Sequence, residues 1–372
     1  MASSLGQAER PLISAVVGTG AISNEHLSFL AGRTAAGDVS AMADLRAVCD
    51  LSPAAGRYAA ATFGAAASYT DLEEMLEVEK PDVVHVLTPP ATHLALATMC
   101  LEAGANVICE KPITINRSDL ENLLATAERC NRQIMESHNY RFNSAIGEIS
   151  AAIAAGELGT VREVTIRIAL PITDPEGRFG DPNLPSLLHC LPAGVIHDFT
   201  THFSYLLIHL APGVVYDRVA AAWSRHGDNE LFSVDDLDAL LVGEGPNGAV
   251  HARLRFDARS APDTFTVTVR GSVGLAETDL FHPYLRMVRP RLGGSKLSPI
   301  VNNLVNGSSL VKSGVRNLGH KLLQQGPYEG LHKMLDLTYR ALVAGVEMPV
   351  SPEDMLAASA LVDSLLDDKA AL

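Results

Sequence analysis

Short apolar segments alternate with longer helical patterns over the first 140 residues. Four of these segments have the length and composition of buried strands, and apolar residues at helical spacing fill the intervals between them. The predicted strands are Leu12–Val17, Leu45–Cys49, Asp82–Leu87 and Asn106–Cys109. The predicted helices are Ala21–Ala31, Pro53–Phe63, Asp71–Glu79, His93–Ala103 and Arg117–Cys130. Regular alternation of strand and helix predicts a doubly wound parallel sheet with helices on both faces.

The pattern changes after about residue 140. In the segment Val161–Leu170, alternate residues from Val164 onward are apolar, which is typical of a half-buried strand. Further strands are predicted at Val214–Trp223, Asp238–Val242, Ala249–Phe256, Phe265–Arg270 and Ala276–Leu280. Helical patterns occur at Ser144–Ala155, Gly330–Ala344 and Pro352–Leu366. Consecutive strands favour an open, mostly antiparallel or mixed sheet flanked by helices. We therefore predict an α/β domain over residues 1–140 and an α+β domain over residues 141–372.

Composition and charge narrow the classes of protein that fit this pattern. The 372 residues are 47% hydrophobic and 19% charged, which indicates sizeable folded cores, and the net charge is −14. A chain this negative repels phosphate backbones, so nucleic acid is not an expected partner. The N-terminus lacks the regions of a signal peptide, and no apolar run is long enough to span a membrane. Five scattered cysteines without a CxxC pair favour reduced thiols in the cytoplasm.

A glycine-rich turn follows the first predicted strand and opens the first predicted helix. Its sequence is Gly18-Thr19-Gly20-Ala21-Ile22-Ser23. In this context the first glycine permits a tight turn, the second lets the backbone approach a pyrophosphate, and the helix N-terminus attracts phosphates. Asp50 ends the second predicted strand, where a carboxylate can accept hydrogen bonds from a ribose diol and would repel a 2′-phosphate. The sequence therefore predicts a dinucleotide site that prefers NAD to NADP.

Three further residues could supply acid–base chemistry. Lys111 follows the fourth predicted strand, at the sheet edge where ligands of such folds bind. Asp198 and His202 lie four residues apart, so a helix would place both on one face. A carboxylate there could orient the imidazole and make it a usable base near neutral pH.

Metal binding is the competing interpretation of the second region. The potential ligands are His189, Cys190, His197, Asp198 and His202. Their spacing matches no standard zinc template, so we predict no metal.

Five motifs occur in an order that resembles the Gfo/Idh/MocA family, named after glucose–fructose oxidoreductase, inositol dehydrogenase and rhizopine catabolism. They are GTGAIS, TPPATH (Thr88–His93), AGANVICEKPIT (Ala103–Thr114), YRF (Tyr140–Phe142) and the Asp198/His202 pair. The terminal PYEGLHKMLDLTYRALVAGVEMPVSPED also resembles the ending of that family. The resemblance implies that Lys111, Asp198 and His202 are catalytic. It also implies that the C-terminal sheet forms the substrate wall and, commonly, the oligomer interface.

The resemblance further implies which residues bind ligands. The nicotinamide cofactor would contact Thr88, Pro89, His93, Glu110 and Lys111 in addition to the glycine-rich turn and Asp50. The further candidates for substrate binding are Arg141 in the YRF motif and His197 beside the catalytic aspartate. The chain departs from the family pattern near its histidine, because Thr200 replaces the usual glycine and Tyr205 replaces an acid. The second departure bears on the substrate contacts rather than on the hydride chemistry.

The segment Leu280–Tyr328 differs in charge from the rest of the chain. It contains no Asp or Glu and seven basic residues, so the remaining residues carry a net charge of −21. The basic residues are Arg286, Arg289, Arg291, Lys296, Lys312, Arg316 and Lys321. Helical spacing of apolar residues on either side of Gly307-Ser308-Ser309 predicts two short amphipathic helices within a basic insertion around residues 286–325.

Two interpretations of this segment remain open. The insertion could bury its apolar stripe on its own domain or on another subunit. Alternatively, its arginines, with Arg286 and Arg289 as the main candidates, could bind the phosphates of a nucleotide-linked sugar or of a lipid at a membrane surface. The polar face is rich in Asn and Ser and only moderately basic, which favours the soluble nucleotide sugar over peripheral membrane contact.

Together these features predict a cytoplasmic, NAD-dependent oxidoreductase. It would transfer a hydride to or from a hydroxyl or keto carbon of a sugar, cyclitol or nucleotide-linked sugar. The alternatives are a redox-neutral epimerase or lyase with tightly bound NAD, and a nonenzymatic NAD-dependent sensor or co-repressor. The joint presence of Lys111, Asp198 and His202 disfavours the sensor. A sheet with one face covered by helices leaves the other face for a partner, which predicts a homodimer or homotetramer.

Overall fold

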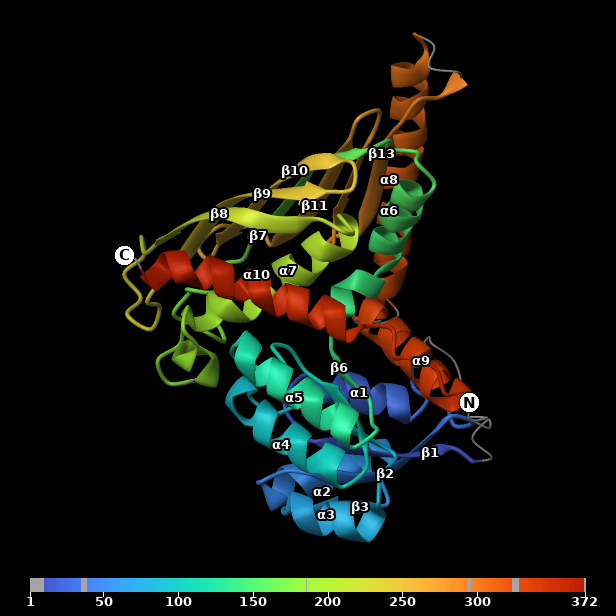
Figure 1. Cartoon of the computed structure of the whole chain (residues 1–372), viewed down its shortest axis with the longest axis vertical. Helices are drawn as coiled ribbons and strands as arrows, with labels where there is room; N and C mark the ends of the chain where they lie inside the picture. The colour runs from blue at the N-terminus through green and yellow to red at the C-terminus, as the bar shows by residue number, and fades with distance from the viewer. Residues whose placement is uncertain (1–9, 35–38, 185, 293–295, 323–327, 371–372) are drawn as a thin grey trace. The chain divides into compact units, whose positions relative to one another are not determined.

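The structure is a computed structural model that describes residues 10–34, 39–184, 186–292, 296–322 and 328–370 (Figure 1). Contacts divide the chain into two units. The first unit comprises Met1–Asn139 and Gly330–Ser359, and the second comprises Tyr140–Glu329 and Ala360–Leu372. The predicted division near residue 140 into cofactor and substrate domains remains a proposal.

Six parallel strands form the sheet of the first unit. They are β1 (Leu12–Val17), β2 (Ala43–Cys49), β3 (Ala67–Tyr69), β4 (Val83–Val86), β5 (Asn106–Cys109) and β6 (Ile134–Glu136). The helices that join them are α1 (Ser23–Leu30), α2 (Pro53–Phe63), α3 (Leu72–Glu79), α4 (Pro90–Glu102) and α5 (Arg117–Arg129). The strand order β3-β2-β1-β4-β5-β6 confirms the predicted doubly wound Rossmann sheet, whose direction of winding reverses between β1 and β4.

A late segment of the chain also belongs to the first unit. Helix α9 (Glu329–Ala344) brings Tyr339 to the sheet, where its hydroxyl lies 2.8 Å from the Ser14 hydroxyl. Gln133 then holds the segment after α9, because its side chain donates to the Val346 carbonyl at 3.1 Å and accepts from the Met348 N–H at 2.8 Å. The first unit therefore includes a helix that lies about 200 residues beyond the predicted domain.

Seven strands form the sheet of the second unit, in the order β13-β12-β11-β7-β10-β9-β8. They are β7 (Val161–Ala169), β8 (Val215–Ser224), β9 (Asp236–Gly245), β10 (Gly248–Asp257), β11 (Thr264–Gly271), β12 (Leu275–Asp279) and β13 (Tyr284–Val288). β7 and β10 run parallel and the other neighbours are antiparallel, which confirms the mostly antiparallel class. The remaining helices are α6 (Ser144–Ala154), α7 (Gly194–Leu210), α8 (Ser298–Leu322) and α10 (Pro352–Ala370).

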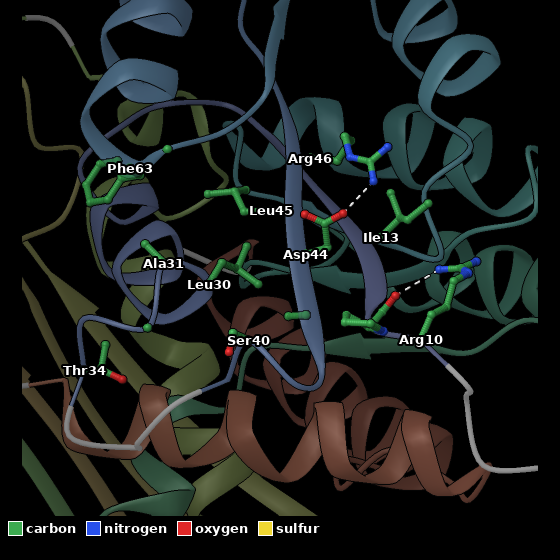
Figure 2. A pocket seen from close by; sticks show the side chains of 14 residues that line it. Arg10, Ile13, Leu30, Ala31, Thr34, Ser40, Asp44, Leu45, Arg46 and Phe63 are labelled. Atoms are coloured by element: carbon green, nitrogen blue, oxygen red, sulfur yellow. Dashed lines mark hydrogen bonds and ion pairs between the residues drawn. The ribbon is translucent and has the colours of Figure 1, made fainter.

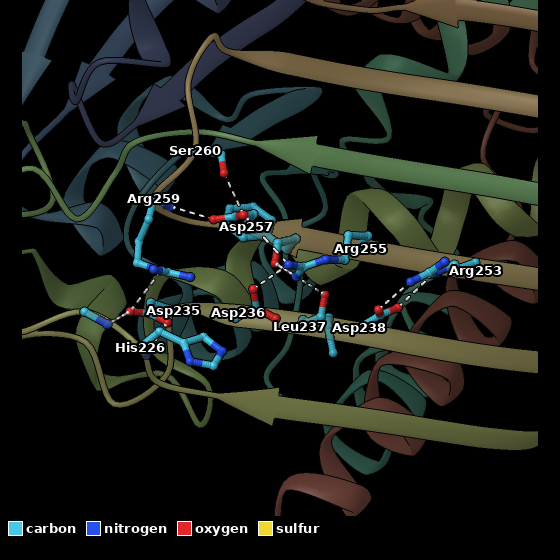
Figure 3. Close-up of polar contacts among 12 residues, drawn as sticks. His226, Asp235, Asp236, Leu237, Asp238, Arg253, Arg255, Asp257, Arg259 and Ser260 are labelled. Carbon is cyan, nitrogen blue, oxygen red and sulfur yellow. Dashed lines mark hydrogen bonds and ion pairs between the residues drawn. The ribbon is translucent and has the colours of Figure 1, made fainter.

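The two faces of this second sheet differ in chemistry. The alternation predicted for β7 is confirmed, because Val164, Ile166 and Ile168 are fully buried on the side against which α7 lies (Figure 1). The other face carries paired charges (Figure 3). There, Arg253 makes a bidentate contact of 3.0 and 2.6 Å with Asp238. This second face also carries Leu240, which pairs with Arg253 and is 59% exposed.

Helix α8 differs from its prediction. The sequence predicted two short helices separated at Gly307, but the structure has one helix of 25 residues. Glycine weakens a helix by only about 1 kcal/mol, and side chains on both sides of Gly307 hold this one to β13: Asn306 accepts from the Met287 N–H, and Ser309 donates to the Leu285 carbonyl. Among the described residues, none of the helices is both long and apolar enough to cross a membrane.

Candidate active site

The glycine-rich turn has the backbone that a dinucleotide fingerprint requires. Gly18 has a φ of +89°, and a Cβ built on it would lie 2.9 Å from the Leu87 carbonyl oxygen, so only glycine fits. Gly20 differs, because apart from its chain neighbours no described atom lies within 4 Å of the equivalent Cβ position. The cap of α1 at Ile22 has no side-chain hydrogen bond. The turn therefore presents open backbone and an uncapped helix N-terminus, which suits a pyrophosphate.

Asp50 stands at the carboxyl end of β2 and accepts three hydrogen bonds. Thr19 donates its N–H at 2.8 Å and its hydroxyl at 2.7 Å to Oδ2, and the Ser52 N–H donates to Oδ1 at 2.8 Å. Burial acts to raise the pKa of Asp50, but these hydrogen bonds outweigh it and lower the pKa below its usual value. Since a carboxylate has about four acceptor positions, the ionised group is held beside the turn with capacity left for a ribose hydroxyl.

His93 connects the two loops that follow β4 and β5. Its Nε2 lies 2.7 Å from the Thr88 carbonyl oxygen and its Nδ1 lies 2.8 Å from the Pro112 carbonyl oxygen. Carbonyl oxygens only accept, so a hydrogen bond to either of them is donated by the imidazole. His93 is fully buried, and it ties the TPPATH loop to the turn that carries Lys111. The structure thereby joins two motifs that the sequence presents separately.

A buried chain of polar contacts runs from Glu110 to helix α9. Glu110 Oε1 lies 3.5 Å from His26 Nε2, and His26 Nδ1 lies 2.8 Å from His85 Nδ1. His85 Nε2 lies 2.9 Å from the Tyr339 hydroxyl, which in turn lies 2.8 Å from Ser14 Oγ. The last four side chains are fully buried. The sequence analysis missed this network, although a histidine inside the predicted buried strand at His85 was a signal that a polar partner must exist.

The donors along this network can be assigned from its end. Ser14 donates its one hydroxyl proton to the Leu12 carbonyl at 3.1 Å, so it accepts from Tyr339. Tyr339 then accepts from His85 Nε2–H, which leaves His85 Nδ1 to accept from His26. Burial, together with the charge on His26, holds the pKa of His85 well below its usual value, in agreement with a neutral ring.

Glu110 lies at the other end of this network, beside His26. Burial raises the pKa of Glu110, but the adjacent His26 and then Lys111 lower it further than burial raises it. Glu110 is therefore ionised, with its Oε1 3.5 Å from His26 Nε2. An ionised Glu110 is thus fixed next to Lys111, which follows β5 at its carboxyl end.

In the second unit, helix α7 carries the other predicted catalytic residues. It is helical over Gly194–Leu210, so Asp198 and His202 lie one turn apart on one face. His202 is almost fully buried, and its Nδ1 lies 2.8 Å from the hydroxyl of Tyr205. The same hydroxyl accepts a hydrogen bond from the Tyr140 N–H at 3.2 Å. Tyr205, which replaces an acid of the family pattern, is therefore a direct partner of the imidazole.

Aromatic rings surround His202. The Tyr140 ring packs edge-on with its centroid 4.9 Å from that of His202, and Phe199 and Phe265 lie at 6.1 and 6.4 Å. Burial raises the pKa of Tyr140 far above its usual value, so this phenol stays neutral. The imidazole is therefore held in an apolar environment with a hydroxyl on one nitrogen.

The arginines predicted to bind substrate contact carboxylates of their own unit. Arg286 Nη1 lies 3.8 Å from Glu277 Oε2 on the neighbouring strand, and Arg289 forms an ion pair with Glu157. Phosphate binding by Arg286 and Arg289 stays a prediction, and it would require these ion pairs to be exchanged for the ligand.

The other two substrate candidates, Arg141 and His197, belong to the second unit. Arg141 belongs to a short 3-10 helix, η1 (Asn139–Phe142), and its guanidinium lies 5.9 Å from the centroid of the Phe142 ring. His197 is fully buried on α7. Their roles toward a substrate stay predictions.

The competing metal interpretation finds no assembled ligand set in the described part of the chain. No group of three or more His, Cys, Asp or Glu side chains there is arranged to hold a metal ion. His189, one of the potential ligands, donates Nε2–H to the Phe179 carbonyl at 2.9 Å.

A pocket in the first unit lies away from the glycine-rich turn (Figure 2). Its lining comes from the starts of β1 and β2 and the ends of α1 and α2, and includes Ile13, Leu30, Leu45 and Phe63. Its two arginines are already paired, Arg10 with Asp82 at 2.7 Å and Arg46 with Asp44 at 2.6 Å. The carboxyl-terminal ends of helices carry a partial negative charge and repel anions. The dinucleotide phosphates are therefore expected at the glycine-rich turn and not in this pocket.

Comparison with known proteins agrees with this arrangement. The profile of the Gfo/Idh/MocA family, described as an oxidoreductase family with an NAD-binding Rossmann fold, matches residues 13–138. D-apiose dehydrogenase of Paraburkholderia graminis is 32% identical over 257 residues, which is 68% of this chain and 63% of the relative. D-glucoside 3-dehydrogenase of Escherichia coli is 28% identical over 194 residues, 50% of this chain and 53% of the relative. The chain thus spans less than two thirds of the length of either relative.

Solved structures share the fold over nearly the whole chain. Levoglucosan dehydrogenase in complex with NADH and levoglucosan has a TM-score of 0.77 at 17% identity, covering 97% of this chain and 98% of that one. The WlbA dehydrogenase of Bordetella pertussis, in complex with NADH and UDP-GlcNAcA, has a TM-score of 0.73 at 17% identity, covering 98% and 97%. With a matching dinucleotide-binding domain and dehydrogenases among its relatives, the chain belongs to the Gfo/Idh/MocA family of oxidoreductases.

Proposed function

We propose that this protein is an NAD-dependent dehydrogenase or reductase that acts on a CH–OH carbon of a sugar or cyclitol. The observation that carries the proposal is that one chain holds two sets of functional residues, one in each unit. The first unit holds a dinucleotide turn, an ionised Asp50 and Lys111 at the carboxyl end of a parallel strand. The second holds a buried imidazole, His202, on the same helix face as Asp198.

The first unit fits NAD(H). The open space at Gly20 and the uncapped start of α1 would receive the pyrophosphate, and Asp50 would accept from the ribose hydroxyls. The loop from Thr88 to His93 and the carboxylate of Glu110 would border the nicotinamide end. The fixed charge of Asp50 supports a preference for NAD over NADP. When bound, the nicotinamide supplies the hydride acceptor or donor.

The residues of the chain handle the substrate oxygen and its proton. Lys111 donates a hydrogen bond to this oxygen and stabilises negative charge on it. His202 Nε2 removes the hydroxyl proton in oxidation and returns it in reduction. Before the transfer, the neutral ring carries its proton on Nδ1 and donates it to the Tyr205 oxygen, which leaves the Nε2 lone pair free. After Nε2 has taken the substrate proton, Nδ1–H still donates to Tyr205, so this hydroxyl holds the ring in both states.

The relatives and the arginine contacts both favour an uncharged sugar as substrate. Two relatives are named as dehydrogenases of D-apiose and of D-glucosides. Arg286 and Arg289 already contact carboxylates, which favours an uncharged sugar over the nucleotide-linked sugar favoured from sequence. A panel of aldoses, glycosides, cyclitols and nucleotide sugars, followed by NADH absorbance, tests this choice.

The assignment of roles is tested by Lys111→Ala and His202→Ala. Each variant should lose roughly 10²- to 10⁴-fold in turnover, as expected when an acid–base group is removed. Each should still bind NAD(H), measured by fluorescence titration, because the dinucleotide turn and Asp50 are untouched. Turnover close to that of the wild-type protein in both variants would contradict the roles.

We also propose that the protein is a cytoplasmic homodimer or homotetramer. The charged face of the second sheet, with its Arg253–Asp238 and Arg255–Asp236 pairs, is the surface for the partner (Figure 3). The cysteines of the described residues are free thiols, which suits a reducing compartment. Light scattering that finds only the 39.5 kDa monomer would contradict the assembly.

A further inference from the structure

Helix α8 turns its polar side toward its own sheet. β13 is the edge strand of the second sheet, and α8 runs alongside it (Figure 1). Asn306 Oδ1 accepts from the Met287 N–H at 3.1 Å, and Asn317 Nδ2 donates to the Pro283 carbonyl at 2.9 Å. Asn302, with 3% of its surface exposed, is the most buried member of this polar stripe. Side chains of α8 therefore supply the partners that an edge strand lacks.

The apolar side of α8 consequently faces solvent. It consists of Ile300, Leu304, Val311, Val315 and Leu318, which lie on one side of the helix opposite the asparagines. Each of these side chains has between 57% and 70% of its surface exposed. This apolar face of α8 extends over five turns of helix and is not used by the fold. An exposed apolar patch of this kind marks an interaction surface.

The charge around the apolar face selects its partner. Lys312 follows Val311 directly, Lys296 lies just before the helix, and both are exposed. Arg316 and Lys321 belong to the same helix, and no acidic residue occurs between residues 280 and 328. Elsewhere the chain is strongly acidic. Two copies of α8 packed together would bring their exposed lysines together, with no carboxylate on either helix to pair with them.

We propose that the apolar face of α8 binds the surface of an anionic lipid bilayer. An apolar stripe flanked by lysines is the composition of a helix that lies in the plane of the headgroups, with its apolar side chains in the acyl boundary and its lysines at the phosphates. In such helices the polar side normally faces water. Here the asparagines and serines bind that side to β13, so the second sheet would lie on the side of α8 that faces away from the bilayer.

The proposal is tested with the full-length protein and lipid vesicles. The protein should sediment together with phosphatidylcholine vesicles that contain a quarter phosphatidylglycerol. Its binding to vesicles of phosphatidylcholine alone should be weaker by roughly tenfold or more. The triple variant Leu304→Gln, Val311→Gln and Leu318→Gln should lose roughly tenfold or more in partition. Lys312→Gln should lose about fivefold, and this loss should disappear at high salt.

Matched controls separate this surface from general apolarity. Val78 and Val346 are exposed to a similar degree, at 63% and 56%, but lie outside α8. The double variant Val78→Gln and Val346→Gln should bind vesicles like the wild-type protein. Circular dichroism of the triple variant checks that it is folded, which is expected because the three replaced side chains are 59–70% exposed. Three results would overturn the proposal. The wild-type protein could fail to bind anionic vesicles, or the triple variant could bind them as well as the wild-type protein does. Alternatively, light scattering could find a smaller mass for the triple variant while neither protein binds vesicles, which would assign the face to a second copy.

Discussion

Tyr205→Phe removes one hydroxyl from the candidate active site and leaves the ring in place. That hydroxyl lies 2.8 Å from His202 Nδ1 and accepts the Tyr140 N–H at 3.2 Å. Tyr205 is only 2% exposed, so water does not readily replace the lost group. The variant therefore distinguishes a residue that positions the proposed base from one that only fills the core.

The expected magnitudes follow from these two contacts. Each lost hydrogen bond costs about 1 kcal/mol, and a buried donor left without a partner costs about 1–3 kcal/mol, so the free energy of unfolding should fall by about 1–3 kcal/mol. In oxidation, His202 becomes an imidazolium whose Nδ1–H no longer has the Tyr205 oxygen as acceptor. A lost hydrogen bond to a charged group costs about 1.5–3 kcal/mol, which lowers kcat/KM roughly 10- to 150-fold.

The assay compares oxidation and reduction in the same variant. Because the overall equilibrium constant is a property of the reactants, kcat/KM should fall by the same factor in both directions. Adding Tyr205→Phe to His202→Ala should cost little more, since the hydroxyl acts through the imidazole. NAD affinity should not change. A lower melting temperature with kcat/KM within twofold of the wild-type value would refute the positioning role and leave only a structural one.

Three further predictions concern the first unit. Asp50→Ala should weaken NAD binding and narrow the gap to NADP in fluorescence titrations, and an unchanged gap would remove Asp50 as the source of selectivity. Gly20→Ala should weaken NAD binding without changing thermal stability, because its Cβ meets no described side chain, whereas Gly18→Ala should destabilise the fold by about 1–3 kcal/mol through its positive φ. Burial lowers the pKa of His85, so below about pH 6.5 this histidine binds a proton in the unfolded chain but not in the folded chain. The free energy of unfolding should therefore keep the full contribution of His85 above that pH and be about 1.4 kcal/mol lower at pH 5.5. Urea unfolding of His85→Gln should lack this part of the pH dependence, and the same dependence in both proteins would count against the assignment.

The sequence predicts most where a repeating pattern spans many residues. The alternation around Val164 and the four longer apolar segments of the first 140 residues mark real strands. β3 and β6 contain three residues each, which is too short for a period to be visible. α7 contains buried residues on all sides, among them His197 and Phe203, so it lacks the apolar stripe by which the other helices were recognised.

The candidate site was predictable where a motif lies within a few residues. Gly18, Asp50 and Lys111 each end a strand, and the parallel sheet brings such ends to one edge. The contact of Tyr339 with His85 joins residues 254 positions apart, and no local pattern encodes it. Tyr205 was noticed as a departure from the family pattern, but its contact with His202 becomes visible only once α7 is seen to be helical.

Helix α8 shows a limit of amphipathic patterns that has a physical cause. An amphipathic pattern indicates that the two sides of a helix differ in polarity, and burial of the apolar side is usually the more stable arrangement. An edge strand changes this balance, because its outward N–H and C=O groups need partners and an apolar side chain provides none. Asn302 donates to the Arg289 carbonyl and Asn306 accepts from the Met287 N–H, so turning them inward satisfies the main chain around β13. The exposed apolar face is then a direct consequence of how the sheet edge is protected. Replacing Asn306 with Leu should therefore loosen α8 from β13 and increase hydrogen exchange at the Met287 N–H, and unchanged exchange there would show that the helix is held by other contacts.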